Sequence, residues 1–342
     1  MGRYSLLGLD IGSNTIKAVQ LDHNAGRYQL KAYGIASTPP KGFESEADSD
    51  LEALSQAIKT LLLDSKVSTN NVVCALPESA VFTRVISLPI LSDKELASAI
   101  HWEAEQYVPV PLDEVNLVWE VLERPKQGKN MEVLLVAAPK ALTEKYIRVL
   151  RGAGLKPLAL ETEIIAVARS LVGESKDSPT SLVISIGAKT TDICIVNKGR
   201  IALTRSISTG GAALARAVAT SLGFDLPKAE EYKKSYGLLE GEMEGKIMLA
   251  IKPVFDLIVT EIKRALAFYQ KGKPGEQVRR VVLCGGSAKL PGAVVYLAQS
   301  LGLEAQIGNP WQKVEMDEKT KGILAEEAAV YGVAVGLAMR GI

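Results

Sequence analysis

Residues 6–19 read LLGLDIGSNTIKAV, an apolar strand, a small polar turn around Gly12 and a second strand. Residues 182–195 read LVISIGAKTTDICI and repeat this order around Gly187. Each copy continues through a glycine turn into a third alternating strand, so a β-meander opens each half of the chain. The two glycines are 187 − 12 = 175 residues apart, about half of the 342 residues. The repeat predicts a duplicated domain with a cleft between the copies.

Further helices and strands follow the two meanders. Apolar residues recur at helical spacing over 50–63 and 212–222, and Gly223 is suited to the C-cap of the second helix. The second half continues with a strand over 278–283, a helix over 292–301 and one long Ala-rich helix over 325–339.

Residues 83–160 have no counterpart in the second half. Their pattern predicts strands over 83–88, 116–122 and 131–137 and helices over 93–107 and 142–153, a small α+β subdomain inserted into the first lobe. The expected division is a first lobe of 1–82, 161–179 and part of the C-terminal helix, an inserted subdomain of 83–160, a second lobe of 180–224 and 275–342, and a helical subdomain of 225–274.

The composition narrows the classes of partner and metal. Lys plus Arg is 40 and Asp plus Glu is 39, so a formal net charge of +1 gives no electrostatic reason to expect nucleic acid or an anionic membrane as the main partner. Cys74, Cys194 and Cys284 lie in strand-like apolar runs without a CxxC pair, and the chain has only two histidines. We expect buried free thiols rather than a zinc site.

The sequence shows no signal peptide and no apolar stretch of the roughly 18–20 residues that a membrane span needs. The expected location is therefore the cytoplasm, with any membrane association made through a partner.

The first copy carries residues suited to a phosphate with its metal ion. They are Asp10, Gly12, Ser13, Asn14, Thr15 and Lys17. The backbone N–H groups of such a turn can surround phosphate oxygens, the lysine can neutralise charge, and the aspartate can hold Mg²⁺ through water. A plain β-hairpin is the alternative interpretation.

The second copy offers a matching turn. Its residues are Gly187, Ala188, Lys189, Thr190 and Thr191. After the meander, Gly210 and Gly211 precede a helix, whose N-terminal amides and dipole favour an anion. The alternative is a glycine loop that only permits close packing.

A third motif, VVLCGGSAKLPG at 281–292, takes a buried strand into a double glycine and a helix start. Gly285 and Gly286 would let the backbone approach a flat ligand such as adenine. The motif is not a Walker A sequence, because GxxxxGK[ST] is absent.

The order of the three motifs resembles that of the actin, Hsp70, sugar kinase and FtsA superfamily. The resemblance implies an α/β, duplicated actin/Hsp70-type (ribonuclease H-like) two-lobed fold with an FtsA-like insertion, and a site for ATP and Mg²⁺. Within that superfamily the chain resembles the PilM family of type IV pilus assembly proteins. The matching runs are RVISLP at 84–89, IHWEAEQYVP at 100–109, LLVAAPK at 134–140, AGLKP at 153–157 and RALAFY at 264–269.

The resemblance assigns the residues of both turns, with Gly210 and Gly211, to the phosphates. It assigns Gly285, Gly286, Ser287 and Leu290 to the adenosine. AEEYK at 229–233 resembles a helix of FtsA-like proteins, which implies that Glu230 and Lys233 contact the nucleoside. An exposed i,i+3 ion pair is the alternative for these two.

One departure from the superfamily bears on catalysis. The second turn usually begins D-x-G, and Ser185 stands in place of the aspartate. A serine carries no charge and holds the waters of the metal more weakly. Asp10 and Glu163 remain as candidate catalytic residues. We expect ATP binding with slow or absent hydrolysis.

The resemblance further implies a cytoplasmic adaptor, peripheral at the inner membrane, that binds the N-terminal cytoplasmic peptide of a PilN-like membrane protein. Other pilus platform proteins and self-association are further expected contacts. Trp102, Tyr107, Val108 and Pro109 are the expected groove residues, with a core position as the alternative for Trp102. No membrane helix of the FtsA type follows Met339.

Two other functions stay open at this point. A true ATPase or a small-molecule kinase of the same superfamily would turn over its nucleotide, and an FtsA-like protein would form filaments. A sugar kinase would need a carboxylate base beside a substrate pocket, and the sequence offers no convincing residue for it. The motifs do not distinguish a pilus machine from one for secretion or DNA uptake.

Overall fold

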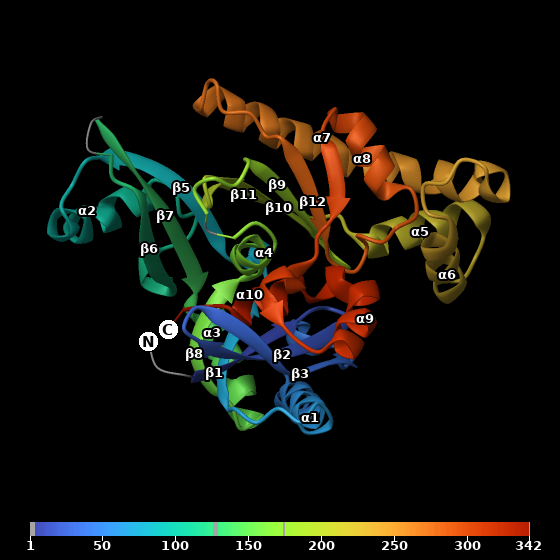
Figure 1. Cartoon of the computed structure of the whole chain (residues 1–342), viewed down its shortest axis with the longest axis horizontal. Helices are drawn as coiled ribbons and strands as arrows, with labels where there is room; N and C mark the ends of the chain where they lie inside the picture. The colour runs from blue at the N-terminus through green and yellow to red at the C-terminus, as the bar shows by residue number, and fades with distance from the viewer. Residues whose placement is uncertain (1–3, 126–128, 174, 342) are drawn as a thin grey trace.

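The protein has two lobes built on two large β-sheets, with a third, smaller sheet beside them (Figure 1). The computed structural model describes residues 4–125, 129–173 and 175–341. Residues 1–3 and 174 of the predicted first lobe, residues 126–128 of the predicted insertion and residue 342 of the predicted second lobe lie outside this description.

The first lobe is built on a six-stranded sheet in the order β14-β3-β2-β1-β4-β8. Its strands are β1 (Tyr4–Ile11), β2 (Thr15–Asn24), β3 (Arg27–Ser37), β4 (Asn71–Leu76), β8 (Lys156–Thr162) and β14 (Val314–Glu315). Strands β1 to β3 are antiparallel neighbours, which confirms the predicted first meander. Helices α1 (Asp48–Asp64) and α3 (Lys140–Gly152) pack against this sheet through a shared apolar core.

The second lobe is built on a five-stranded sheet in the order β11-β10-β9-β12-β13. Its strands are β9 (Ser181–Ile186), β10 (Thr191–Asn197), β11 (Arg200–Ile207), β12 (Arg280–Cys284) and β13 (Glu304–Ile307). One core joins this sheet to helices α5 (Gly211–Leu222), α6 (Leu226–Tyr236), α7 (Lys246–Gly272) and α8 (Ala293–Leu301). The predicted helical segment 225–274 is thus helical and packs on the core of the second lobe. Gly223 ends α5 in the left-handed conformation, with φ 67°.

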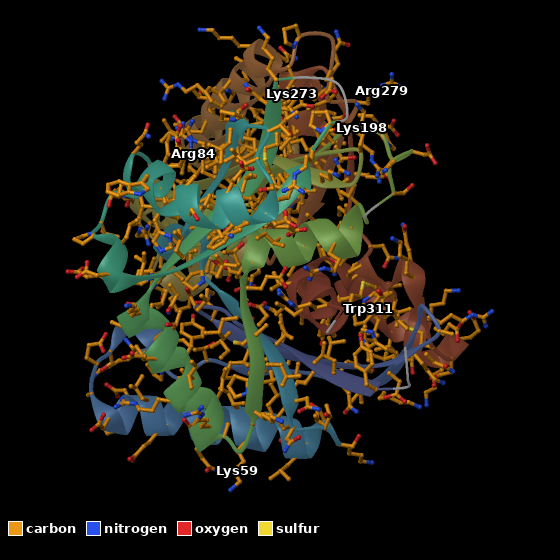
Figure 2. The ribbon with its side chains drawn as sticks, turned by 90° about the vertical axis from the view of Figure 1, so that its left-hand side faces the viewer. Lys59, Arg84, Lys198, Lys273, Arg279 and Trp311 are labelled. Carbon is orange, nitrogen blue, oxygen red and sulfur yellow. The ribbon has the colours of Figure 1, made fainter. Side chains whose placement is uncertain are left out.

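The third sheet forms the insertion, which is antiparallel with the order β5-β7-β6. Its elements are β5 (Phe82–Pro89), α2 (Asp93–Glu105), β6 (Val115–Glu123) and β7 (Asn130–Pro139). A capping box starts α2: Ser92 Oγ accepts the Glu95 N–H and the Glu95 side chain accepts the Ser92 N–H. Lys273, at the end of α7, donates to Glu132 of β7 at 2.9 Å and ties the insertion to the second lobe (Figure 2).

The insertion is shorter than its predicted range of 83–160. Helix α3 packs on α1, and β8 pairs with β4 in the first sheet, so residues 140–160 lie in the layers of the first lobe. The strand and helix patterns of this segment are the same whichever sheet it joins, and the sequence therefore did not reveal the difference.

The single long helix predicted over 325–339 is wrong. The segment contains the end of α9 (Glu318–Glu327), a 3₁₀ turn η6 (Ala328–Tyr331) and α10 (Gly332–Ala338). The Ala329 carbonyl accepts the N–H of Gly285, the residue after β12, at 2.9 Å. This carbonyl at the break is therefore bonded outside the helix. Residues of η5 (Pro310–Lys313), α9 and α10 pack with β2 of the first sheet, although most of this region was predicted in the second lobe.

Helices α4 (Glu163–Leu171) and α10 lie between the two large sheets (Figure 1). The close packing of α10 on β1 and on α4 requires two glycines. A Cβ at Gly8 of β1 would lie 2.0 Å from the Ala334 oxygen, and a Cβ at Gly336 would lie 1.8 Å from the Ala166 oxygen. This packing fixes the N-terminus of α4, and with it Glu163, where the two lobes meet.

The structure bears out the expected state of the three cysteines. Cys74, Cys194 and Cys284 are buried free thiols. Within the described residues, no helix is both long and apolar enough to cross a bilayer, and no cluster of three His, Cys, Asp or Glu side chains is suited to a metal ion.

Candidate functional site

A cavity of about 640 Å³, here called the cleft, is lined by residues of both lobes. From the two turns it contains Asp10, Gly12, Ser13, Asn14, Thr15, Lys17, Gly187, Ala188, Lys189 and Thr190. From the rest of the predicted site it contains Glu163, Gly211, Glu230, Lys233, Gly285, Gly286 and Ser287. Motifs that are far apart in the sequence therefore meet at one cavity.

The two turns have the same backbone geometry. The Gly12 N–H donates to the Thr15 oxygen at 3.0 Å, and the Gly187 N–H donates to the Thr190 oxygen at 2.9 Å. Two N–H groups in each turn have no hydrogen-bond partner among the described residues. They belong to Ser13, Asn14, Ala188 and Lys189. Each turn can thus offer amides to an anion in the cleft.

The N-terminus of α5 holds the second turn in place. The N–H groups of Gly211 and Ala212 donate to the Gly187 and Ala188 oxygens, each at 2.9 Å. These two amides are used within the protein, and the placement of Gly210 and Gly211 beside the phosphates stays a prediction. A Cβ at Gly210 would lie 2.7 Å from the Gly187 oxygen, which explains the glycine there.

Three predicted residues support the cleft without lining it. Gly210 packs behind the second turn. Thr191 is fully buried and donates through Oγ1 to the Thr209 oxygen at 2.7 Å, which fixes the loop before α5. Leu290 lies in the core of the second lobe.

An acid of the second motif to which the sequence analysis gave no role also lines the cleft. Asp192 of β10 lies opposite Ser185 of β9, as Lys17 lies opposite Asp10 in the first lobe. Ser206 Oγ and Thr190 Oγ1 donate to the Asp192 carboxylate. Burial raises the pKa of Asp192, and these two hydroxyls oppose the rise. Its offset from Gly187 equals that of Lys17 from Gly12, which was the available signal.

Glu163 is the first residue of α4, and it lines the cleft. Burial, followed by the nearby Asp10 and Asp192, raises the pKa of Glu163 well above its ordinary value, and Lys17 only partly opposes this. These surroundings favour the protonated form of Glu163, which can donate a hydrogen bond. Asp10 accepts a bond from Lys17 Nζ at 3.0 Å.

The side of the cleft formed by α6 carries a buried cation. Lys233 is 4% exposed and donates to Glu230 Oε2 at 2.7 Å and to the Gly211 oxygen at 3.2 Å. The i,i+3 ion pair of the alternative interpretation is present, but its lysine is buried rather than exposed. A Cβ at Gly211 would lie 2.3 Å from Ser287 Oγ and 3.3 Å from Lys233 Nζ, so glycine keeps this part of the cavity open.

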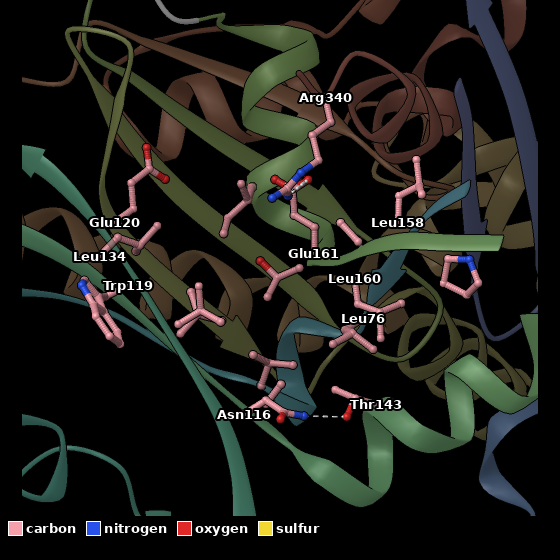
Figure 3. A pocket seen from close by; sticks show the side chains of 18 of the residues that line it. Leu76, Asn116, Trp119, Glu120, Leu134, Thr143, Leu158, Leu160, Glu161 and Arg340 are labelled. Carbon is pink, nitrogen blue, oxygen red and sulfur yellow. Dashed lines mark hydrogen bonds and ion pairs between the residues drawn. The ribbon is translucent and has the colours of Figure 1, made fainter. Parts of the chain in front are cut away.

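A second cavity of about 590 Å³, here called the groove, lies between the insertion and the first lobe (Figure 3). Apolar side chains dominate its lining, including Leu76, Val81, Val118, Trp119, Leu134, Leu158 and Leu160. Asn116 and Thr143 are bonded at 2.8 Å in its wall. Two strands that line it, β6 and β8, are edge strands of their sheets.

One end of the groove is charged. The buried Glu161 carboxylate is paired with Arg169 and with Arg340, whose Nη1 lies 3.0 Å from Glu161 Oε2 (Figure 3). Two guanidinium groups against one carboxylate leave a net positive charge at this end. Glu120, on β6, supplies a negative charge elsewhere in the lining.

None of the four residues predicted for a partner groove lines this one. Trp102 is 73% exposed on α2, so the alternative that it belongs to the core is wrong. Tyr107 lies under the Arg84 guanidinium, 4.6 Å from the ring centre, Val108 is in the core of the insertion, and Pro109 is exposed. The aromatic residue of the groove is Trp119, which its position within an ordinary alternating strand did not distinguish.

Known proteins are similar to this chain over nearly its whole length. The family model "Type IV pilus assembly protein PilM" matches residues 8–342. A solved PilM-PilN type IV pilus biogenesis complex is similar, with a TM-score of 0.86, 32% identity and 98% of each chain covered. The cell division protein FtsA of Pseudomonas aeruginosa is 23% identical, covering 98% of this chain and 89% of that protein.

A more distant protein of the actin-like fold is also similar to this chain. A structure of MreB5 of Spiroplasma citri bound to ADP has a TM-score of 0.55 and 15% identity, with 97% of this chain and 94% of that chain covered. At this identity the likeness concerns the fold alone. With the duplicated halves, the cleft between them and a family match from residue 8 to residue 342, the chain belongs to the PilM family of type IV pilus assembly proteins.

Proposed function

We propose that this protein is an ATP-binding adaptor of the type IV pilus inner-membrane platform, which holds the N-terminal cytoplasmic peptide of a PilN-like protein in the groove. It would work at the cytoplasmic side of the inner membrane, attached through that partner. The main support for this proposal is that one chain has two separate cavities, a polar cleft with unpaired amides and an apolar groove.

The cleft fits Mg-ATP in its size and its donors. Its volume is within the roughly 300–1,000 Å³ usual for small-molecule sites. The unpaired amides of the two turns would take phosphate oxygens, and Lys17 and Lys189 would balance their charge. Glu230 and Lys233 would contact the nucleoside beside the double glycine. The ADP bound to MreB5, a protein of the same fold, supports a nucleotide in this place.

A magnesium ion would lie near Asp10 and Asp192, held through water, and would neutralise phosphate charge. Both carboxylates line the cleft, one from each lobe. Ser185 lacks the charge of the usual aspartate, and Asp192 on the neighbouring strand supplies a carboxylate opposite it.

Hydrolysis should be slow, because the three carboxyl groups nearest the two turns are engaged with other groups of the protein or favour the protonated form. The raised pKa of Glu163 favours its protonated form, Asp10 is paired with Lys17, and Asp192 accepts bonds from two hydroxyls. We expect turnover far below the roughly 1 s⁻¹ at the low end for ordinary enzymes. A measured rate above that value would instead favour the ATPase alternative.

The groove suits an extended peptide with apolar side chains. Edge strands β6 and β8 have unpaired outer sides for main-chain contacts, and Val118 and Leu158 are 61% and 37% exposed between them. The solved relative is a complex of PilM with PilN, which supports a PilN-like occupant.

Titration of a fluorescent PilN-like N-terminal peptide tests this proposal. Leu158→Glu should abolish binding, because it places a charge in the apolar lining. Trp102→Ala is the matched control and should leave the affinity unchanged, since Trp102 lies outside the groove. Loss of binding in the control alone would move the partner site to α2. Calorimetry with ATP, with and without Mg²⁺, tests the cleft separately.

A further inference from the structure

The cleft and the groove are separated by a thin wall. Residues 76–81 run along both cavities: Leu76 and Val81, at the two ends, line the groove, and three residues between them line the cleft. Thr162 and Glu163 divide in the same way, with the threonine in the groove and the glutamate in the cleft. A change inside this wall would therefore act on both cavities.

A carboxyl group is buried inside the wall. Glu78, the first residue of η2 (Glu78–Ala80), is 5% exposed and lines neither cavity. Its Oε2 atom has no hydrogen-bond partner, and the same holds for Thr83 Oγ1 and Thr162 Oγ1. These are three of the four buried side-chain polar atoms that lack a partner among the described residues. Such atoms are rare in folded proteins and call for an explanation.

Three threonines from three parts of the molecule face this carboxyl group. Thr83 is in β5 of the insertion, Thr162 ends β8 of the first lobe, and Thr204 is in β11 of the second lobe. Thr204 Oγ1 also donates to the Thr83 oxygen at 3.3 Å, so the insertion and the second lobe touch here. Glu78 thus lies where all three parts meet.

The groups that interact electrostatically with Glu78 are two acids and a thiol. The titratable groups that act on it or respond to it are Asp192 and Cys194 of β10 and Glu163 of α4, with no cation of the described residues among them. Burial, and then Asp192, raise the pKa of Glu78 to about 7, against the pull of the three threonines. A proton on Glu78 would both remove a repelled charge and supply a donor for an unpaired threonine oxygen.

We propose that Glu78 is a protonation-dependent latch, which holds the insertion and the second lobe against the wall when neutral and loosens that junction when ionised. The neutral acid donates a hydrogen bond within the threonine cluster, and water stays excluded from the wall. The carboxylate draws water into the wall, and the contact between β5 and β11 opens more often. The groove, bounded by Val81 and Thr162 of this wall, loosens with it.

Hydrogen exchange of β5 and β11 amides, corrected for intrinsic rates, measures this opening between pH 6 and pH 8. If opening returns Glu78 to its ordinary pKa of 4.5, the opening constant rises about tenfold over this range. Glu78→Gln, which stays neutral, should remove the rise. Glu114→Gln, an exposed acid of η3 (Leu112–Glu114), is the control and should retain it. An equal rise in wild type and Glu78→Gln overturns the latch, as does faster opening of Glu78→Gln at every pH.

A second variant covers the case in which Glu78→Gln fails to fold. Of the three hydroxyls, that of Thr162 lowers the pKa of Glu78 most, and its Oγ1 has no other partner, so Thr162→Val should move the midpoint of the opening transition to higher pH. A merely structural hydroxyl would change the amplitude without moving the midpoint, and an unmoved midpoint therefore overturns the proposal.

The affinity of the PilN-like peptide gives a readout that rests on the proposed function. It should fall between pH 6 and pH 8 in the wild type and stay level in Glu78→Gln. An equal fall in both proteins counts against the latch. Absence of peptide binding at every pH would instead refute the proposed function, and the exchange measurement would still decide the latch.

Discussion

Lys17 and Asp192 occupy equivalent places in the two halves of the molecule. Each lies five residues after its turn glycine, as 17 − 12 = 5 and 192 − 187 = 5, and each faces the residue two positions before that glycine. The first lobe therefore places acid and base across one strand pair, and the second lobe places serine and acid across the other. The carboxylate absent at position 185 is present on the neighbouring strand.

Asp192→Asn should weaken Mg-ATP binding about tenfold, since it removes one of two carboxylates proposed to hold the waters of the metal. Without Mg²⁺ the affinity for ATP should stay level or rise, because a negative charge near the phosphates is gone. Calorimetry in Mg²⁺ and in chelator checks both. Asp113→Asn, an exposed acid of η3, is the control. An equal loss in both buffers would argue against a metal role.

Lys17→Met should lower ATP affinity by roughly tenfold to a hundredfold, the value of one charge-assisted bond to phosphate. Adenosine, which lacks phosphates, should bind as before. Lys31→Met serves as control, since it removes a lysine of β3 that lies outside the cleft lining. If adenosine binding falls in parallel with ATP binding, the loss is structural.

Glu44→Gln should raise ATP affinity by about twofold to fivefold at low ionic strength. Glu44, in η1 (Gly42–Glu44) of the first lobe, is ion-paired with Lys189 of the second turn, and both residues line the cleft. Releasing Lys189 leaves its charge for phosphate, and an exposed pair of this kind is worth at most about 1 kcal/mol. Raising the salt concentration should erase the difference. Unchanged affinity at low salt would mean that the pair does not compete with nucleotide.

Gly8→Ala should destabilise the fold by about 3 kcal/mol or more, because its Cβ would overlap the Ala334 oxygen of α10. Gly322→Ala is the opposite case: its Cβ meets nothing within 4 Å on an exposed face of α9, and helix propensity should add up to about 1 kcal/mol. Urea unfolding of the two variants measures both effects. Equal stability of Gly8→Ala and wild type would contradict the close packing of α10 on β1.

Local patterns predicted the elements and the three motifs well. Both meanders, α5 with its Gly223 cap, and most cleft residues lie as the spacing indicated, since turns and strand alternation depend on neighbouring residues. The break in the C-terminal helix was not predictable in this way. It depends on Gly285, which follows β12 and donates its N–H to the Ala329 carbonyl.

Long-range pairing also decided the partner side. The sequence favoured Trp102 as an aromatic anchor, but the face of α2 that it occupies is set by how the insertion packs on its own sheet. Trp119 reaches the groove because β6 is an edge strand beside β8, and no local pattern states which strand ends a sheet. The buried Glu78 escaped notice for the same reason: its three threonines come from three separate parts of the chain.

Arg340 and Gly341 line one end of the groove, and this matters for anyone who builds a fusion protein. A bulky group attached near these two residues would lie beside the cavity and obstruct an incoming peptide. A pull-down with such a fusion protein would recover no peptide partner because access to the groove is blocked. Figure 1 shows α6 on the side of the molecule away from β6 and β8. Gly241 follows α6 in the chain and has open space where a side chain would project, so this loop is the safer place for a reporter.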